Sequence, residues 1–170
     1  MDRINGADTV DIGGGKRGFQ DEDLLGPVTG TEVTALWLNT VQEELLKIIE
    51  AAGLDADPGN WGQLATAIQS GSMNYAVATG TATALLAAFS PPVASLVPGL
   101  ALRVKPIADA TGASTINPDG LGVIAVVDRT GAPIIPGFWQ AGDILSLVYD
   151  GANFRVMGGN TVVSTTFATT

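Results

Sequence analysis

The feature that most constrains this chain is residues 34–53, TALWLNTVQEELLKIIEAAG. The apolar side chains in this stretch recur at spacings of three, four, three and four: Leu38, Val41, Leu45, Ile48 and Ala52. This spacing places them in one stripe along a helix, at the a and d positions of a heptad repeat. An isolated helix of this length is marginal in water, so the stripe needs a partner. The spacing alone favours neither the helix's own domain nor further copies of the chain.

Residues that favour helix ends bound this helix and predict a second one. Thr34, or Thr31 one turn earlier, suits the N-cap, and Gly53 suits the left-handed position that follows a helix. Asp57 followed by Pro58 is typical of an N-cap and a first helical residue, so a shorter helix is expected over residues 58–70. Two helices joined by a short loop predict a helical hairpin, the stem, within residues 31–72.

Residues 1–30 show no helical or strand periodicity, and glycines interrupt them repeatedly. We therefore expect an extended anchoring arm. The arm carries too many apolar residues for a merely solvated tail, and such an arm can become ordered by lying on another protein. The side chains expected to dock in this way are Ile12, Phe19, Leu24 and Leu25.

The period changes from 3.6 to 2 after Ser72. Residues 100–105 alternate most cleanly between apolar and polar or small side chains. Further strands are expected at residues 75–79, 113–117, 123–128, 134–135, 144–149 and 154–157, with glycine-containing turns between them. Many short strands predict a small antiparallel β-sandwich or barrel-like unit over residues 73–158. The fold class is thus α+β, with residues 159–170 as an edge strand or a C-terminal tail.

Charge is unevenly distributed. Residues 1–70 contain 12 acidic and 4 basic residues, a net charge of −8, whereas residues 71–170 carry 5 acidic and 4 basic residues. The net charge of −9 argues against nucleic acid and anionic membrane surfaces as partners, because both are bound largely through basic residues. No apolar run reaches the roughly 18 residues of a spanning helix, and the N-terminus is too polar for a secretory signal. We expect that the protein does not insert into a membrane. We also expect that it is assembled in a cytoplasm.

The composition also argues against catalysis. Histidine and cysteine are absent, which removes the usual bases, nucleophiles and transition-metal ligands. Four aspartates of the β unit could in principle pair for glycoside cleavage, but each falls in or beside an expected turn, where local hydrogen bonding favours aspartate: Asp119, Asp128, Asp143 and Asp150. No phosphate-loop or calcium-loop pattern is complete. We expect no enzyme, no cofactor and no metal site.

Three tryptophans could act as stacking platforms for a ligand. Trp37 and Trp61 lie on expected apolar helix faces, so both are predicted to be core residues. Trp139, within the glycine- and proline-containing segment 136–142, is expected to be partly exposed and is the candidate for contact with a receptor.

Several segments together resemble tailed-bacteriophage tail fibre proteins. The helical part carries the resemblance in TEVTALWLNTVQEEL from Thr31, IEAAG from Ile49 and WGQLATAI from Trp61. The β part carries it in PGLALRVK from Pro98, TGASTIN from Thr111, GLG from Gly120, AGD from Ala141 and VYDG from Val148. The matches extend from about residue 31 to residue 158.

The resemblance implies a homotrimeric structural protein of the virion tail. Its N-terminal arm would attach to baseplate or tail-tip proteins, and the trimer interface would contain Trp37, Leu38, Val41, Leu45, Ile48 and Ala52. The chain would be a short fibre or adaptor, or the anchoring part of a fibre that contributes to host adhesion. Alternatives are a head fibre or capsid decoration protein, and a module that binds or, as the weaker alternative, cleaves host surface glycan.

Overall fold

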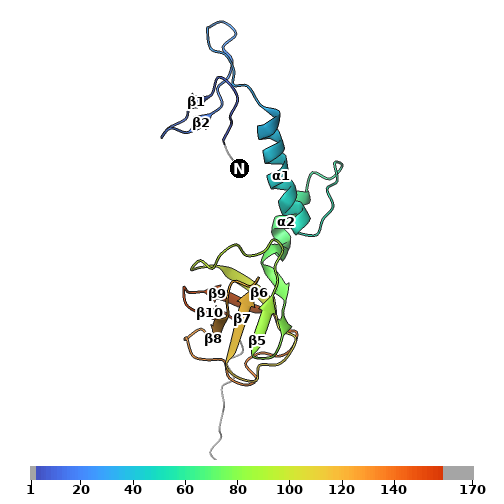
Figure 1. Cartoon of the computed structure of the whole chain (residues 1–170). Helices are drawn as coiled ribbons and strands as arrows, with labels where there is room; N and C mark the ends of the chain where they lie inside the picture. The colour runs from blue at the N-terminus through green and yellow to red at the C-terminus, as the bar shows by residue number, and fades with distance from the viewer. Residues whose placement is uncertain (1–2, 159–170) are drawn as a thin grey trace, which may run out of the picture. The chain divides into compact units, whose positions relative to one another are not determined.

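The computed structural model describes residues 3–158 and contains two compact units, Met1–Gln69 and Ser70–Thr170 (Figure 1). Two α-helices belong to the N-terminal half, and a large sheet forms the body of the second unit, which confirms the α+β class. Within the described residues, neither helix has the length and apolar character needed to cross a membrane. The expected edge strand or tail at residues 159–170 lies outside this range.

The first helix, α1 (Ala35–Ala51), has the ends that the sequence predicts. Thr34 is the N-cap, and its hydroxyl accepts a hydrogen bond from the amide of Trp37 at 3.3 Å. At the other end Gly53 adopts a φ of +77°, its amide donates to the carbonyl of Glu50, and the amide of Leu54 donates to the carbonyl of Ile49. These two bonds form a Schellman motif, which satisfies carbonyls that the helix end would leave unpaired.

The second helix, α2 (Gln63–Ser70), begins five residues later than the sequence predicts. Asp57 is not an N-cap: its carboxylate accepts a hydrogen bond from the amide of Gly59, and its carbonyl accepts one from the amide of Asn60. The Asn60 side chain in turn accepts from the amide of Gly62. Asp-Pro therefore starts a turn here, because aspartate can bond to the amide two residues on as readily as it caps a helix.

The N-terminal segment is more ordered than its sequence indicates. Two short strands, β1 (Val10–Asp11) and β2 (Arg17–Gly18), pair antiparallel as a small hairpin that the lack of periodicity did not predict. The segment then returns along itself: Glu32 and Thr31 donate hydrogen bonds to the carbonyls of Ala7 and Asp8. Ile4 is only 2% exposed.

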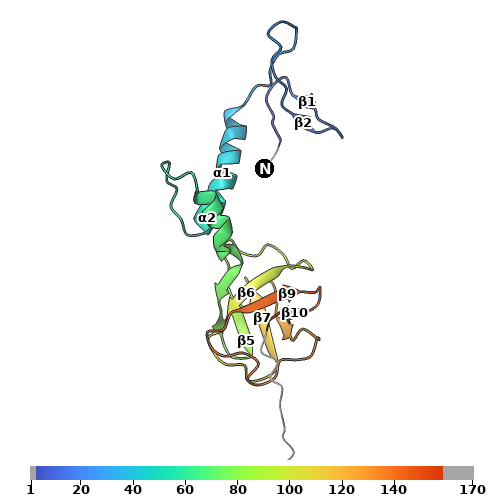
Figure 2. The same ribbon diagram turned by 180° about the vertical axis from the view of Figure 1, so that it is seen from behind.

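In the described part of the second unit, eight strands form one sheet in the order β3-β6-β9-β10-β8-β7-β5-β4. Figure 1 labels six of them, β5 to β10. The strands are β3 (Tyr75–Val77), β4 (Thr79–Gly80), β5 (Ala84–Ala87), β6 (Ala101–Lys105), β7 (Ser114–Pro118), β8 (Ile124–Val127), β9 (Leu145–Tyr149) and β10 (Phe154–Val156). A single 3-10 turn, η1 (Ser72–Asn74), precedes them. Figure 2, which views the chain from behind, shows β6 and β9 side by side, and the two strands pair antiparallel.

The sheet is nearly closed into a barrel. Its outermost strands β3 and β4 follow one another directly in the chain, separated only by Ala78, whose amide donates to the carbonyl of Lys105. Residues 75–80 therefore act as one bent strand that pairs with β6 in its first half and with β5 in its second. The inward side chains form one core with Leu102, Val104, Ile116, Leu147 and Phe154 at its centre.

The sheet is mixed, so the expectation of a purely antiparallel unit was wrong. Three pairings are parallel: β3 with β6, β5 with β7, and β10 with β8. Turn residues between consecutive strands do not determine which strands become neighbours. Here β5 pairs with β7, although β6 lies between them in the chain. In the same way β8 pairs with β10, although β9 lies between them in the chain. Residues 134–135 contribute no strand, and Pro133 makes only an isolated bridge to Val127.

Candidate interaction surfaces

The stripe on α1 remains open in the single chain. Leu38 and Leu45 are 51% and 44% exposed, and Val41, Ile48 and Ala52 are half-buried. We call these five residues the α1 stripe. Leu38, Leu45 and Ala52 occupy the a positions and Val41 and Ile48 the d positions, because the step from a to d is three residues and the step from d to a is four. The stripe is thus an apolar seam without a partner among the described residues.

The two flanks of the stripe are covered differently. On the side of Trp37, the ring of Phe19 approaches edge-on with its centroid 5.1 Å from that of Trp37. On the other side, Ile49 is buried, and a groove of about 420 Å³ runs between α1 and the segment that leads into α2. The groove is lined mainly by Leu45, Leu46, Ile49, Pro58, Trp61 and Leu64. The chain therefore shields the edges of the stripe while leaving its centre accessible.

Trp61 is exposed to 97%, so the prediction that it belongs to the core was wrong. The reason is the late start of α2, which leaves Trp61 on the loop instead of on the buried face of a helix. That loop is held in place by Gln63, which is 8% exposed: its amide nitrogen donates to the carbonyl of Asp55 and its oxygen accepts from the amide of Asp57. The indole N–H of Trp61 donates to the carbonyl of Pro58 at 3.2 Å. The loop thus presents an indole whose polar group already has a partner.

The expected docking side chains of the arm are on the surface. Leu24 and Leu25 are 85% and 101% exposed, Ile12 is 64% exposed, and Phe19 is 47% exposed because one side contacts Trp37. The loop that carries Leu24 and Leu25 is closed by a backbone bond from Asp23 to Val28 at 3.0 Å. A second apolar hollow of about 490 Å³ lies among Ile4, Ile12, Phe19 and Trp37, with Arg3 and Arg17 at its margin.

Trp139 lies in the core of the β unit. Its side chain is 2% exposed, and its indole N–H donates to the carbonyl of Ala108 at 3.2 Å. The expectation of a partly exposed Trp139 was therefore wrong, and a side chain this buried offers no stacking surface to a receptor. Glycine and proline neighbours suggested a loop, which the structure does contain, but the loop folds its tryptophan inward.

Three of the four aspartates singled out in the β unit bond to backbone amides of their own turns. Asp143, Asp128 and Asp150 each accept hydrogen bonds from backbone amides within a few residues, as expected for turns. Asp119 differs, because its carboxylate accepts from the amides of Phe89 and Val93, about 30 residues away, at 3.0 and 2.8 Å. Asp119 itself has a φ of +47°. Asp119 therefore holds its own loop to the loop at residues 89–93, so the bonds of its carboxylate are not those of a local turn.

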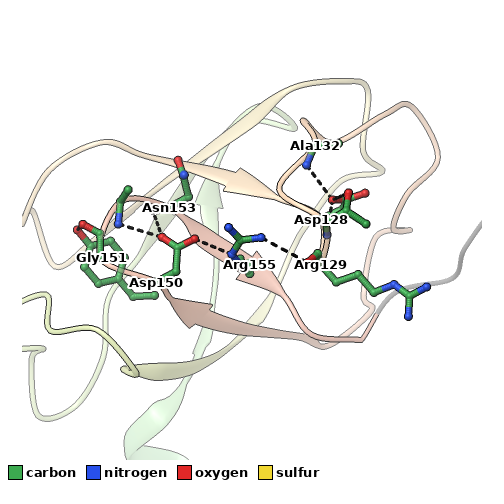
Figure 3. Close-up of polar contacts among 10 residues, drawn as sticks. Asp128, Arg129, Ala132, Asp150, Gly151, Asn153 and Arg155 are labelled. Atoms are coloured by element: carbon green, nitrogen blue, oxygen red, sulfur yellow. Dashed lines mark hydrogen bonds and ion pairs between the residues drawn. The ribbon is translucent and has the colours of Figure 1, made fainter.

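Asp150 and Asp128 are two carboxylates of the β unit whose hydrogen bonds lower their pKa (Figure 3). The backbone amides of Asn153 and Ala152 donate to the Asp150 carboxylate, and Arg155 Nε lies 2.6 Å from its other oxygen. These interactions lower the pKa of Asp150 to about 2. The Thr130 hydroxyl and the Ala132 amide lower the pKa of Asp128 in the same direction. Arg155 also donates to the carbonyl of Arg129, so the two turns are connected. These contacts favour the ionised form of both carboxylates, which suits a structural role in the two turns.

Among residues 3–158, no three acidic or other metal-ligating side chains are grouped so that they could hold a metal ion. Neither a protein-family model nor a curated protein matches this chain.

Proposed function

We propose that this chain is a non-enzymatic structural protein of a phage virion, a homotrimeric tail fibre or the anchoring segment of one. The observation that carries the proposal is the open α1 stripe, with Leu45 44% exposed at its centre. A soluble protein rarely leaves a continuous apolar seam uncovered, and a helix with a heptad seam is most simply completed by copies of itself. The resemblance of residues 31–158 to tail fibre proteins supports the same assignment.

The order of the side chains supports an assembly larger than a dimer. Leu38 and Leu45 occupy a positions, and the β-branched Val41 and Ile48 occupy d positions. Leucine at a combined with isoleucine at d favours three or four parallel helices over two. Three-fold symmetry, which the resemblance implies, falls within this range. In this arrangement residues 31–72 form the helical stem, including the hairpin expected from the sequence.

The remaining parts have separate roles in the proposal. The arm attaches the trimer to baseplate or tail-tip proteins through Ile12, Phe19, Leu24 and Leu25, and the β unit forms the shaft or a compact head that contributes to host adhesion. The protein is assembled in the host cytoplasm and resides in the tail of the virion. The exposure of the two apolar side chains Leu24 and Leu25 supports attachment through the arm.

A matched pair of variants tests the assembly. Leu45→Asp places a carboxylate in the seam, where it would be buried without a partner, so light scattering should show the mass of a single chain instead of three. Leu36→Asp adds the same charge to the same helix at a position that is 67% exposed and outside the stripe, and it should remain trimeric. A wild-type protein that is monomeric at micromolar concentration would refute the proposal. A cryo-EM map of the virion would then decide between tail and capsid attachment.

A further inference from the structure

The groove beside α1 and the indole at its margin are not explained by the α1 stripe alone. Trp61 is 97% exposed although it is the largest apolar side chain of its loop, and Leu45, Ile49 and Leu64 lie in the same groove. Large exposed aromatic residues are uncommon on soluble proteins and are enriched at the centres of protein interfaces. The loop is also pre-ordered by Gln63, so little further ordering is needed to present the indole.

The heptad register determines what lies opposite this groove in an assembly of parallel helices. Gln42 and Ile49 occupy e positions, and Glu44 and Ala51 occupy g positions. In a parallel coiled coil, the e flank of one helix lies against the g flank of its neighbour. The groove opens beside Ile49, on the e flank, so a neighbouring α1 would bring its residues 44–51 to the groove.

The chemistry of the two surfaces also agrees. The indole N–H of Trp61 already donates to the carbonyl of Pro58, so the ring can be covered by apolar groups without leaving a buried donor unpaired. At the g flank Ala51 is small and uncharged, and Ile48, in a d position one turn before it, is half-buried and apolar. Apart from Asp57, the groove lining carries no charged side chain, and the neighbouring flank of a second copy is apolar at Ile48 and Ala51, with Glu44 at its N-terminal end.

We propose that Trp61 of each chain packs against the residue 44–51 flank of the neighbouring α1 and closes the groove between subunits. This inference rests on the proposed trimer and adds to it a contact outside the a and d seam. Each subunit then holds its neighbour in one direction around the three-fold axis. The loop 55–62 has a role in assembly and not only in connecting two helices.

Fluorescence tests the position of Trp61 directly. The emission of Trp61 is obtained as the difference between wild type and Trp61→Phe, and its accessibility is measured with acrylamide. The quenching constant of Trp61 in the assembled protein should be at least threefold lower than its quenching constant in the Leu45→Asp variant, obtained by the same subtraction. Equal quenching in the two states would overturn the inference, as would protection that arises only after incorporation into virions, because another protein would then cover the indole.

A second measurement is the strength of association. Trp61→Ala should weaken assembly at least tenfold on dilution while leaving circular dichroism unchanged, because the side chain makes almost no buried contact within its own chain. Leu25→Ala removes an equally exposed apolar side chain far from the groove in sequence and serves as the control, with association expected within twofold of wild type. Trp61→Ala association within twofold of wild type would refute the inference. A trimer that survives this change leaves the proposed function standing, whereas a monomeric wild type overturns both.

Discussion

Asp150 shows how a surface carboxylate can contribute to a turn. It accepts hydrogen bonds from the amides of Asn153 and Ala152 and faces Arg155, and the turn carries no other acidic group. Each of these donors interacts more strongly with the ionised carboxylate than with the protonated acid, which is why the pKa is lowered. Asp119 uses the same chemistry over a longer distance, by receiving two amides from the loop at residues 89–93.

The lowered pKa makes a prediction about pH. The pKa of Asp150 is about 2 in the folded chain and ordinarily 3.8, so its contribution to stability is present well above pH 3.8 and is lost as the pH falls towards 2. Asp150→Asn should therefore unfold more easily than wild type at pH 7, and the difference should shrink progressively between pH 4 and pH 2. Urea denaturation at several pH values measures this. A difference that is the same at pH 7 and at pH 2 would contradict the assignment.

Strand β5 is an element that the sequence pattern did not predict. Residues 84–87 read ALLA, a composition typical of helices, and their pattern predicts no strand. In the structure Leu85 and Ala87 point into the core and are 1% and 3% exposed, while Leu86 on the opposite face is 48% exposed. Pairing on both sides, with β4 and β7, outweighs the local preference, as tertiary context commonly does.

The two adjacent leucines of β5 give a matched test. Leu85→Ala should reduce the free energy of unfolding by about 2–5 kcal/mol, because it leaves a cavity in the barrel core. Leu86→Ala is the same chemical change one residue along, on the exposed face, and should alter it by about 0.5 kcal/mol or less. Chemical denaturation, followed by the fluorescence of the buried Trp139, measures both. Equal effects would show that residues 84–87 do not alternate between inside and outside.

The elements differ in how far they could be predicted. The caps of α1 and the strand at residues 101–105 follow from local patterns, since Thr34, Gly53 and the alternation around Leu102 act within a few residues. The burial of Trp139 and the parallel pairings depend on contacts between distant segments, whereas the start of α2 is set by local turn bonds of Asp57 and Asn60. Trp61 could have been foreseen in part, because Asp57, Pro58, Gly59 and Asn60 together also suit a turn that would leave it outside the helix.

At the scale of the whole molecule, the proposed attachment and the proposed assembly involve different side chains. The arm carries exposed apolar side chains at its loop, and the α1 stripe lies elsewhere in the first unit. Neither Leu24 nor Leu25 is part of the stripe or of the groove beside it. A change at Leu24 or Leu25 should therefore leave the proposed assembly intact, whereas Phe19 contacts Trp37 and belongs to both surfaces.

Truncation tests this separation. Removal of residues 1–28 should leave the trimer intact but abolish incorporation into particles, because the docking side chains are lost. Leu25→Asp is the milder variant: it charges a fully exposed side chain and should reduce incorporation without disturbing the hairpin of β1 and β2. Val123→Asp, at a 70% exposed position of the β unit, is the control and should incorporate normally. Incorporation of the truncated chain at wild-type levels would show that the anchor lies in another segment.

The bent strand at residues 75–80 has a consequence for how β units can meet. Because β3 and β4 are both engaged, with β6 and β5, the described part of the sheet leaves only two- and three-residue stretches of unpaired backbone at its margins. Long free margins recruit strands from other molecules and so promote aggregation. Three copies brought to high local concentration by their stems would thus touch through side chains, and each barrel would keep its own hydrogen bonds. If the proposed trimer forms, the crowding of its β units would therefore leave the fold of each one intact.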